Sequence, residues 1–200
     1  MKKLINHPPS AVREMLEGAV ALAPGQRLLA DENVVVQADL PPPAARPVAV
    51  ISGGGSGHEP AHAGYVGRGM LTAAIAGDVF TSPSTDAVLA GITSVAGPAG
   101  VVLIVKNYTG DRLNFGLAAE MARAQGIPAE VVIVADDVSL RATVDPARRR
   151  GIAGTVLVHK IAGAAAAGRA SLGEIARVAR EAADDLGSMG VALGACTIPG

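Results

Sequence analysis

A glycine-rich segment that directly follows an apolar run is the feature that most constrains how this chain can fold. Residues 47–51 predict a buried strand, and residues 53–57 then place four glycines within five positions. Glycine lets the backbone turn sharply and approach a ligand closely, and the N–H groups of such a loop can bind oxygen atoms. His58 follows at once, and an imidazole titrates near neutral pH. The segment predicts a loop that holds a small polar ligand beside a group that moves a proton.

The glycine segment alone leaves an alternative open. It has no lysine of the kind that ends a nucleotide phosphate loop, and it fits the dinucleotide-binding spacing G-x-G-x-x-G poorly. A tight strand-to-helix turn with one surface histidine explains the same residues. Glu59 either orients His58 or serves as an acid in the first turn of a helix.

A second polar segment follows a second strand. Residues 100–105 form a β-branched run, and Lys106 and Asp111 come soon after it. Ligands of an open parallel sheet bind at the carboxyl ends of its strands. We therefore expect His58, Lys106 and Asp111 to converge across one cleft. The alternatives are a helix N-cap for Asp111 and a solvated loop lysine for Lys106.

Alternating strand and helix patterns predict the fold class. Strands are expected at residues 33–36, 47–51, 70–75, 100–105 and 131–134. Helices are expected after Ser10, over 60–69 (bearing a structural His62) and 84–96, beyond Asp111 (with Leu113, Leu117 and Met121), over 154–167, and from Ser171 to 185. This order predicts an α/β domain, with a largely parallel or mixed sheet and helices on both faces. Two hundred residues suit one such domain.

Composition argues against several classes of function. The net charge of −1 indicates no nucleic-acid partner. Residues 161–167 are too short to span a membrane, no signal peptide is visible, and the single Cys196 suits a reducing, cytoplasmic setting. Asp136 and Asp137 resemble half of a metal site, but a capping or solvated pair is favoured and no metal is predicted. Asp78 is either a ligand-facing residue or a turn residue.

Several segments together resemble the signatures of the dihydroxyacetone kinase substrate-binding subunit. They are residues 52–60 (SGGGSGHEP), 77–83 (GDVFTSP) and 106–111 (KNYTGD), supported by 1–6 (MKKLIN), 149–155 (RRGIAGT) and 192–197 (ALGACT). The resemblance therefore runs along the whole chain. Members of this family phosphorylate dihydroxyacetone, and they resemble one another whether the phosphate comes from ATP or from a phosphotransferase relay.

The resemblance implies roles for six residues. His58 is the acid/base group, and Asp111 assists proton removal from the attacking hydroxyl. The ketose site is lined by Gly55, Ser56 and Gly57, and Lys106 contacts the substrate hydroxyls. ATP or ADP with Mg²⁺ is expected on a separate helical nucleotide-binding subunit or a fused domain, so that this chain itself binds no cofactor. The resemblance also implies a homodimer.

One departure from the family changes the expected function. The family holds its ketone through a hemiaminal to a histidine of a second domain, shortly after an Ala-Cys-Thr-Ile-Pro stretch. None of the four histidines, which are His7, His58, His62 and His159, lies in that context. We therefore expect residues 1–200 to correspond to the first substrate-binding domain without the second. Two alternatives remain: a truncated, non-catalytic ketose-binding module, and a phosphosugar isomerase or lyase, which the 106–111 segment disfavours.

Overall fold

Six strands form one mixed sheet in the computed structural model, which describes residues 4–139 and 142–198. The strand order is β1-β2-β4-β3-β5-β6. Neighbours from β4 through β3 and β5 to β6 are parallel, and β1 and β2 complete the sheet with antiparallel pairings. The strands are β1 (Gln26–Leu28), β2 (Val34–Gln37), β3 (Ala49–Ser56), β4 (Ala73–Val79), β5 (Val101–Lys106) and β6 (Ala129–Val134). The predicted α/β class with a mixed sheet is confirmed.

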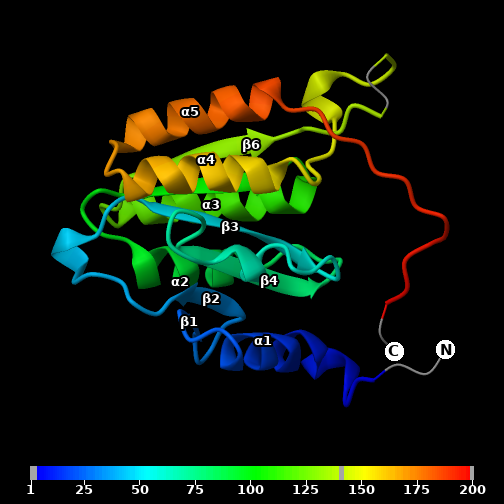
Figure 1. The fold of residues 1–200 in the computed structure, drawn as a ribbon, viewed down its shortest axis with the longest axis horizontal. Coiled ribbons are helices and arrows are strands. Elements are labelled where there is room, and N and C mark those ends of the chain that lie inside the picture. Colours follow the sequence, from blue (N-terminus) through cyan, green and yellow to red (C-terminus); the bar gives the residue numbers. More distant parts are fainter. Residues whose placement is uncertain (1–3, 140–141, 199–200) are drawn as a thin grey trace.

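Helices cover both faces of this sheet, as Figure 1 shows. Helices α1, α4 and α5 pack on one face, and α2 and α3 pack on the other. The α-helices are α1 (Ala11–Ala21), α2 (Thr85–Val95), α3 (Thr109–Ala124), α4 (Thr155–Ala167) and α5 (Leu172–Asp185). Short 3-10 helices are η1 (Pro8–Ser10), η2 (Pro43–Ala45), η3 (Ala63–Tyr65) and η4 (Pro146–Arg148). No helix within the described ranges has the length and apolar character that crossing a membrane requires.

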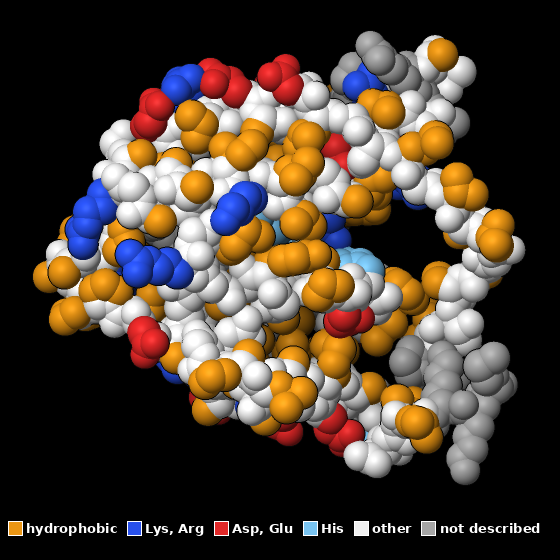
Figure 2. All heavy atoms as spheres, in the orientation of Figure 1, with side chains coloured by type: hydrophobic (Ala, Val, Ile, Leu, Met, Phe, Trp, Pro, Cys, Tyr) orange, Lys and Arg blue, Asp and Glu red, His pale blue; other side chains and the backbone are white. Residues whose placement is uncertain are grey.

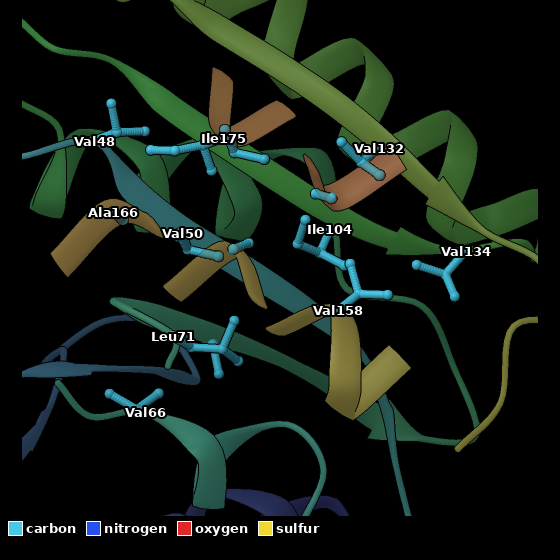
Figure 3. Close-up of a cluster of buried hydrophobic side chains, with 14 of the residues drawn as sticks. Val48, Val50, Val66, Leu71, Ile104, Val132, Val134, Val158, Ala166 and Ile175 are labelled. Carbon is cyan, nitrogen blue, oxygen red and sulfur yellow. The ribbon is translucent and has the colours of Figure 1, made fainter. Parts of the chain in front are cut away.

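The apolar strands are buried on both faces, which explains their continuous hydrophobic runs. In β5, Val102 and Ile104 belong to the cluster under α4 and α5. The alternate residues Val101, Leu103 and Val105 belong to the cluster under α2 and α3. Figure 3 shows Ile104 beside Val158 of α4 in the first cluster. Aromatic side chains are scarce, so valine, isoleucine, leucine and alanine fill both layers. The sheet is thus a platform packed from both sides, and its strand ends are held in place.

Serine caps begin two of the predicted helices. The Ser84 hydroxyl accepts a hydrogen bond from the Ala87 N–H at 3.1 Å, and the Ser171 hydroxyl accepts one from the Glu174 N–H at 3.3 Å. Ser10 occupies the N-cap position of α1, but its side chain makes no capping hydrogen bond. The predicted continuous helix after Gly154 is confirmed as α4.

The prediction of a loop at the glycine segment is wrong, because β3 continues through it to Ser56. Residues of β3 from Ile51 to Gly55 pair in register with β4, and the register shifts only between Gly55 and Ser56. The pairing partner lies more than twenty residues away in the chain, so local glycine content pointed to a loop where the sheet imposes a strand.

The predicted helix over residues 60–69 is also wrong. The segment forms turns around η3, followed by an isolated bridge between Val66 and Leu71. The Gln26 side chain donates to the Val66 carbonyl at 2.8 Å, and the Gln37 side chain donates to the carbonyls of Gly67 and Leu71. These bonds from β1 and β2 satisfy carbonyls that a helix would have used itself, in a segment whose glycines already disfavour a helix.

Helix α3 forms where predicted but buries a different face. Leu113 and Leu117, which made the helical pattern, are 66% and 55% exposed. The buried face instead carries Phe115 and three alanines. Small side chains on this face let the helix lie close to the sheet, and the leucines are left at the surface.

Candidate active site at the carboxyl edge of the sheet

The parallel strands β3 and β5 end at the same edge of the sheet and bring Lys106 and His58 together. The two strands are direct neighbours, with Ser52 paired to Ile104. Lys106 is the last residue of β5, and His58 lies in the turn after β3. The Lys106 Nζ atom is 2.9 Å from the His58 Nε2 atom. An ammonium has no acceptor, so Nζ donates this bond and the Nε2 atom of His58 carries the lone pair.

Asp111 joins this cluster from the first turn of α3. The N-cap of that helix is Tyr108, so the capping explanation of Asp111 is wrong. The Asp111 side chain is 3% exposed and accepts a hydrogen bond from the Ser82 hydroxyl. Its Oδ1 atom is buried and has no hydrogen-bond partner among the described residues. The cluster therefore contains a buried carboxylate oxygen that is ready to accept a hydrogen bond.

Burial shifts the two buried charges of the cluster toward their neutral forms. It lowers the pKa of Lys106, and the nearby Asp111 carboxylate opposes this shift. It raises the pKa of Asp111, and the Ser82 hydrogen bond, Lys106 and His58 oppose that shift in turn. Each charge therefore depends on the other in a place that water solvates poorly. Such perturbed groups at one strand edge are typical of a functional site.

Two glycines of β3 leave space at this strand end, one for the cluster and one for the loop after β4. A Cβ atom at Gly54 would lie 3.2 Å from Lys106 Cε and 3.5 Å from Asp111 Oδ2, at a φ of 152° that side chains rarely adopt. A Cβ atom at Gly55 would lie 2.6 Å from the backbone nitrogen of Thr81. The glycines are needed for close approach at a strand end, and loop flexibility is not the reason for them.

Some polar groups around the glycines form hydrogen bonds within the chain and are not free to bind a ligand. The Ser56 hydroxyl donates to the Gly77 carbonyl at 2.8 Å, which ties β3 to β4. The Gly57 N–H donates to Glu59 Oε1 at 2.9 Å. Glu59 thus holds the turn, instead of orienting His58 or starting a helix. Fewer free donors remain at this segment than the sequence predicted.

Two residues near the cluster were not singled out from the sequence. Ser82 lies in the loop after β4, and the close fit of this loop is visible at Gly110, where a Cβ atom would lie 2.6 Å from Ser82 Oγ. The Tyr108 ring centroid is 5.7 Å from Lys106 Nζ, and burial raises the pKa of Tyr108. The signal was available, because both residues follow parallel strands that end at this edge. Asp78 is an exposed residue of β4.

A groove of about 400 Å³ opens next to the cluster. Its lining includes Asn107, which follows Lys106, together with Arg112 and Arg148. Figure 2 shows exposed histidine atoms and neighbouring Lys or Arg side chains at the rim of the open space beside the extended C-terminal segment. This edge of the molecule is therefore open and carries positive charge.

Asp136 and Asp137, at the end of the next strand, make structural contacts. Asp136 accepts hydrogen bonds from the N–H groups of Ile152 and Gly154, both at 2.7 Å. Asp137 forms an ion pair with Arg150 at 2.6 Å. Both aspartates are thus bound within the chain, and Asp136 holds the segment that leads into α4.

Comparisons with known proteins relate this chain to one family. A family model described as the Dak1 domain matches residues 17–200. The whole chain is 52% identical to the triokinase/FMN cyclase of Homo sapiens, of which it covers 35%. The crystal structure of the dihydroxyacetone kinase of Citrobacter freundii matches with a TM-score of 0.86 and 51% identity, over 92% of this chain and 34% of that chain.

A third similar protein has a different described role. The structure of a dihydroxyacetone kinase operon co-activator matches with a TM-score of 0.80 and 39% identity, over 88% of this chain and 52% of that chain. The chain thus spans about one third of the human relative and of the Citrobacter enzyme, and about half of the co-activator.

Proposed function

Because this chain belongs to the Dak1 domain family, we propose that it is the substrate-binding part of a dihydroxyacetone kinase. In this proposal it holds a small ketose at the carboxyl edge of the sheet and prepares one hydroxyl for phosphoryl transfer. The similar human and Citrobacter proteins are named for kinase activities of this kind. A dihydroxyacetone kinase joins a phosphoryl group to a terminal hydroxyl, which must lose its proton in the reaction.

The observation that carries this proposal is the contact between Lys106 and His58 beside the buried Asp111. The Nζ–Nε2 distance of 2.9 Å keeps the lone pair of the His58 ring at a defined point of the site. Asp111 Oδ1 lacks a protein partner and can accept the hydrogen bond of a substrate hydroxyl. When Lys106 turns its hydrogen bond to a substrate oxygen, the Nε2 lone pair of His58 is free to take the proton of that hydroxyl as a positioned base.

We assign roles to the individual residues on this basis. His58 is the acid/base residue, and Asp111 orients the attacking hydroxyl and assists the removal of its proton. Lys106 donates hydrogen bonds to the substrate oxygens and balances the charge of Asp111. The backbone of Gly55, Ser56 and Gly57 forms the wall of the site. The Ser56 hydroxyl contributes by fixing that wall to β4.

The phosphoryl donor belongs on a separate helical subunit or fused domain in this proposal. Within the described residues, no three His, Cys, Asp or Glu side chains are grouped to hold a metal ion. Asp111 lies beside an ammonium, which competes with a cation for the same carboxylate. The side chains at this site therefore do not fit Mg²⁺. The open, arginine-bearing groove at Asn107 suits the approach of a Mg²⁺–nucleotide carried by that partner.

We further propose that the chain forms a homodimer in the cytoplasm. Leu113 and Leu117, one turn apart on α3, are both more than half exposed, and adjacent apolar surface of this kind favours association. The free, exposed Cys196 suits a reducing compartment. Sedimentation at micromolar concentration tests the dimer, and a monomer would contradict it.

A second candidate function is a ketose-binding module without catalysis. The likeness to an operon co-activator favours it, because that protein shares the fold at 39% identity. Both functions use the same ketose site. They differ in whether bound dihydroxyacetone is phosphorylated when a nucleotide-binding partner and Mg²⁺–ATP are present.

The test has two stages. NMR titration of the chain with dihydroxyacetone should move the ring signals of His58, and the His58→Ala and Asp111→Asn variants should weaken binding. Addition of the nucleotide-binding partner with Mg²⁺–ATP should then yield dihydroxyacetone phosphate. Binding without turnover would support the non-catalytic module, and the absence of binding at millimolar ketose would contradict both functions.

The same samples test the mode of binding. The chain should bind dihydroxyacetone weakly and without a covalent link, because the hemiaminal histidine expected from the family is absent from residues 1–200. Discrimination from glycerol should be poor for the same reason. Intact mass spectrometry after borohydride treatment should show no adduct. A stable adduct on any of the four histidines would contradict noncovalent binding.

A further inference from the structure

Two histidines that the proposed reaction leaves unused lie behind His58. His62 is 7% exposed in the turn segment after β3, and His159 is fully buried in α4. The His62 Nδ1 atom is 3.0 Å from the His159 Nε2 atom. The rings of His58 and His62 meet edge to face, with centroids 5.8 Å apart and planes at 85°. Three imidazoles thus lead from Lys106 at the site into the core.

The position of His159 is costly for a polar ring. Its neighbours on the buried face of α4 are Val158 and Ala162, and it lies against the apolar cluster of that face. A buried polar group of this kind is tolerated when it has a hydrogen-bond partner. Within the described residues, His62 is the side chain that forms a hydrogen bond with the His159 ring. Breaking the bond between the two rings would leave a buried imidazole nitrogen unpaired, so the two side chains are expected to stay together.

Both rings of the pair are neutral near pH 7. Burial is the main cause that lowers the pKa of His159 to about 3, and Lys106 adds to it. Burial also lowers the pKa of His62 well below its ordinary value, with further contributions from His159, Lys106 and His58. Neutral imidazoles can share only one hydrogen between the facing nitrogens, so one ring donates and the other accepts.

The tautomer of His159 therefore determines what His62 presents beside His58. If His159 Nε2 donates, then His62 carries its proton on Nε2; if His159 accepts, then His62 Nε2 is a bare lone pair. The outer atoms, His62 Nε2 and His159 Nδ1, are buried without a hydrogen-bond partner in the described chain. Thr155 Oγ1, one turn before His159 on α4, is buried and unpartnered as well. A hydroxyl there can serve either tautomer of His159 through a bridging water.

We propose that the His62–His159 pair is a positioning device for His58, in which His159 acts from the core through His62. This deepens the proposed function, because it concerns the acid/base residue of the same site. His58 is an exposed ring in a turn, and within the described residues the hydrogen bond of its ring is to Lys106. Contact with the fixed edge of His62 supplies the second constraint that holds a ring in one orientation. Loss of that constraint leaves the lone pair of His58 misaligned with the substrate hydroxyl.

The first test reads the His58 ring itself and needs no kinase activity. In His159→Phe, a ring of similar volume fills the core but cannot bond to His62 Nδ1. We expect the ¹⁵N and ¹³C ring signals of His58 to shift and broaden in this variant at neutral pH. His159→Gln, whose amide can reach the same atom, should restore the wild-type signals. Val158→Ala, a buried change on the same helix, should lower stability and leave those signals in place.

A second variant, His62→Gln, keeps the test decisive if His159→Phe does not fold. His62→Gln removes the ring beside His58 from a turn near the surface, where replacement is better tolerated. It should disturb the His58 signals as His159→Phe does. Wild-type His58 signals in His62→Gln, or in a folded His159→Phe, would overturn the proposal.

The third arm measures catalysis by the chain with its nucleotide-binding partner. His159→Phe should lower kcat by about tenfold while the KM for the ketose changes little, since the ring is misplaced and not removed. His159→Gln should recover most of the loss. A fall in melting temperature with unchanged kcat would mean that the pair only packs the core, and would also overturn the proposal. If the wild type shows no kinase activity, the proposed function fails, and the His58 signals still decide the positioning role.

Discussion

Two buried carboxylate clusters lie at the ends of neighbouring parallel strands, and they are built in opposite ways. Beyond β6, Asp136 accepts two backbone N–H bonds and a hydroxyl bond from Ser188, and Asp137 is paired with Arg150. Beyond β5, Asp111 is as deeply buried but has an oxygen without a partner among the described residues. The electrostatics agree, because the pKa of Asp137 is lowered to about 2 while the pKa of Asp111 is raised.

This difference in hydrogen bonding indicates that, at one edge of the sheet, one cluster stabilises the fold and the other binds a ligand. A carboxylate whose hydrogen bonds are all met within the chain has nothing left to offer a ligand, and it stabilises the loops that it joins. A buried carboxylate oxygen without a hydrogen-bond partner lowers the free energy of unfolding. Such an oxygen is retained where it binds a ligand. We therefore assign the Asp136–Asp137 cluster to the fold and the Asp111 cluster to the ligand, and the predictions below test that division.

The largest expected effect is on catalysis by Asp111→Asn. The amide keeps the shape of the side chain and still accepts the Ser82 bond, but it loses the charge that assists proton removal. We expect kcat/KM for phosphorylation to fall by about 10³-fold, within the range usual for acid/base residues. Stability in urea should be unchanged or slightly higher.

The control for this prediction is Asp78→Asn, at an exposed carboxylate of β4 near the same edge. It should keep wild-type activity. Activity of Asp111→Asn within threefold of the wild type would remove Asp111 from the mechanism.

The second effect is on the stability of Asp136→Ala. This change leaves the N–H groups of Ile152 and Gly154 without their acceptor in a buried setting. We expect the free energy of unfolding to fall by about 3 kcal/mol, since each unmet buried group costs about 1–3 kcal/mol. Urea denaturation followed by circular dichroism measures it. An equal loss in Asp111→Ala would contradict the division between the clusters.

Sequence patterns predicted the platform better than the roles of these acids. Runs of β-branched residues located the buried strands, and helix caps such as Ser171 located helix starts, because these signals are local. The convergence of His58, Lys106 and Asp111 followed from the rule that ligands bind at strand ends. The bonds that set Asp136 apart come from residues 16 and 18 positions later, and no local pattern encodes them.

The failures share the same cause. The glycine segment is a strand because β4 pairs with it, and residues 60–69 are not a helix because Gln26 and Gln37 bind their carbonyls from distant strands. The face of α3 was misjudged because Leu113 and Leu117 dominate the pattern, whereas close packing selects alanine. In each case a contact distant in sequence overrides a local preference.

The third prediction concerns the pH dependence of stability, where the two clusters should have opposite signs. Hydrogen bonds from Ser139 and then Arg150 lower the pKa of Asp137 to about 2, against about 3.9 for an unfolded aspartate. Its stabilisation is therefore complete above that unfolded pKa and is lost as the pH falls toward 2. Burial raises the pKa of Asp111, so this group destabilises the fold at neutral pH and ceases to do so in acid.

Unfolding of Asp137→Asn and Asp111→Asn at a series of pH values separates the two signs. The wild type should be more stable than Asp137→Asn at pH 7, and the difference should shrink below pH ~4. It should be no more stable than Asp111→Asn at pH 7, and the two should converge in acid. If both substitutions changed the free energy of unfolding at pH 7 in the same direction, the proposed difference between the two clusters would be wrong.

The smallest effect comes from a matched pair of serines, each of which donates a hydroxyl to one cluster. Ser82 donates to Asp111, and Ser188 donates to Asp136. Ser188→Ala should lower the free energy of unfolding by about 1 kcal/mol and leave activity unchanged, because its acceptor keeps two backbone partners. Ser82→Ala should change stability by less, because the loss of its bond raises the pKa of Asp111 further and favours the neutral acid that burial already prefers. Its activity should fall by about tenfold, since fewer molecules then hold the charged carboxylate that orients the hydroxyl. Urea denaturation and steady-state kinetics on both variants decide the point. If the two serines exchange these effects, so that Ser188 governs turnover and Ser82 governs stability, the assignment of the clusters is reversed.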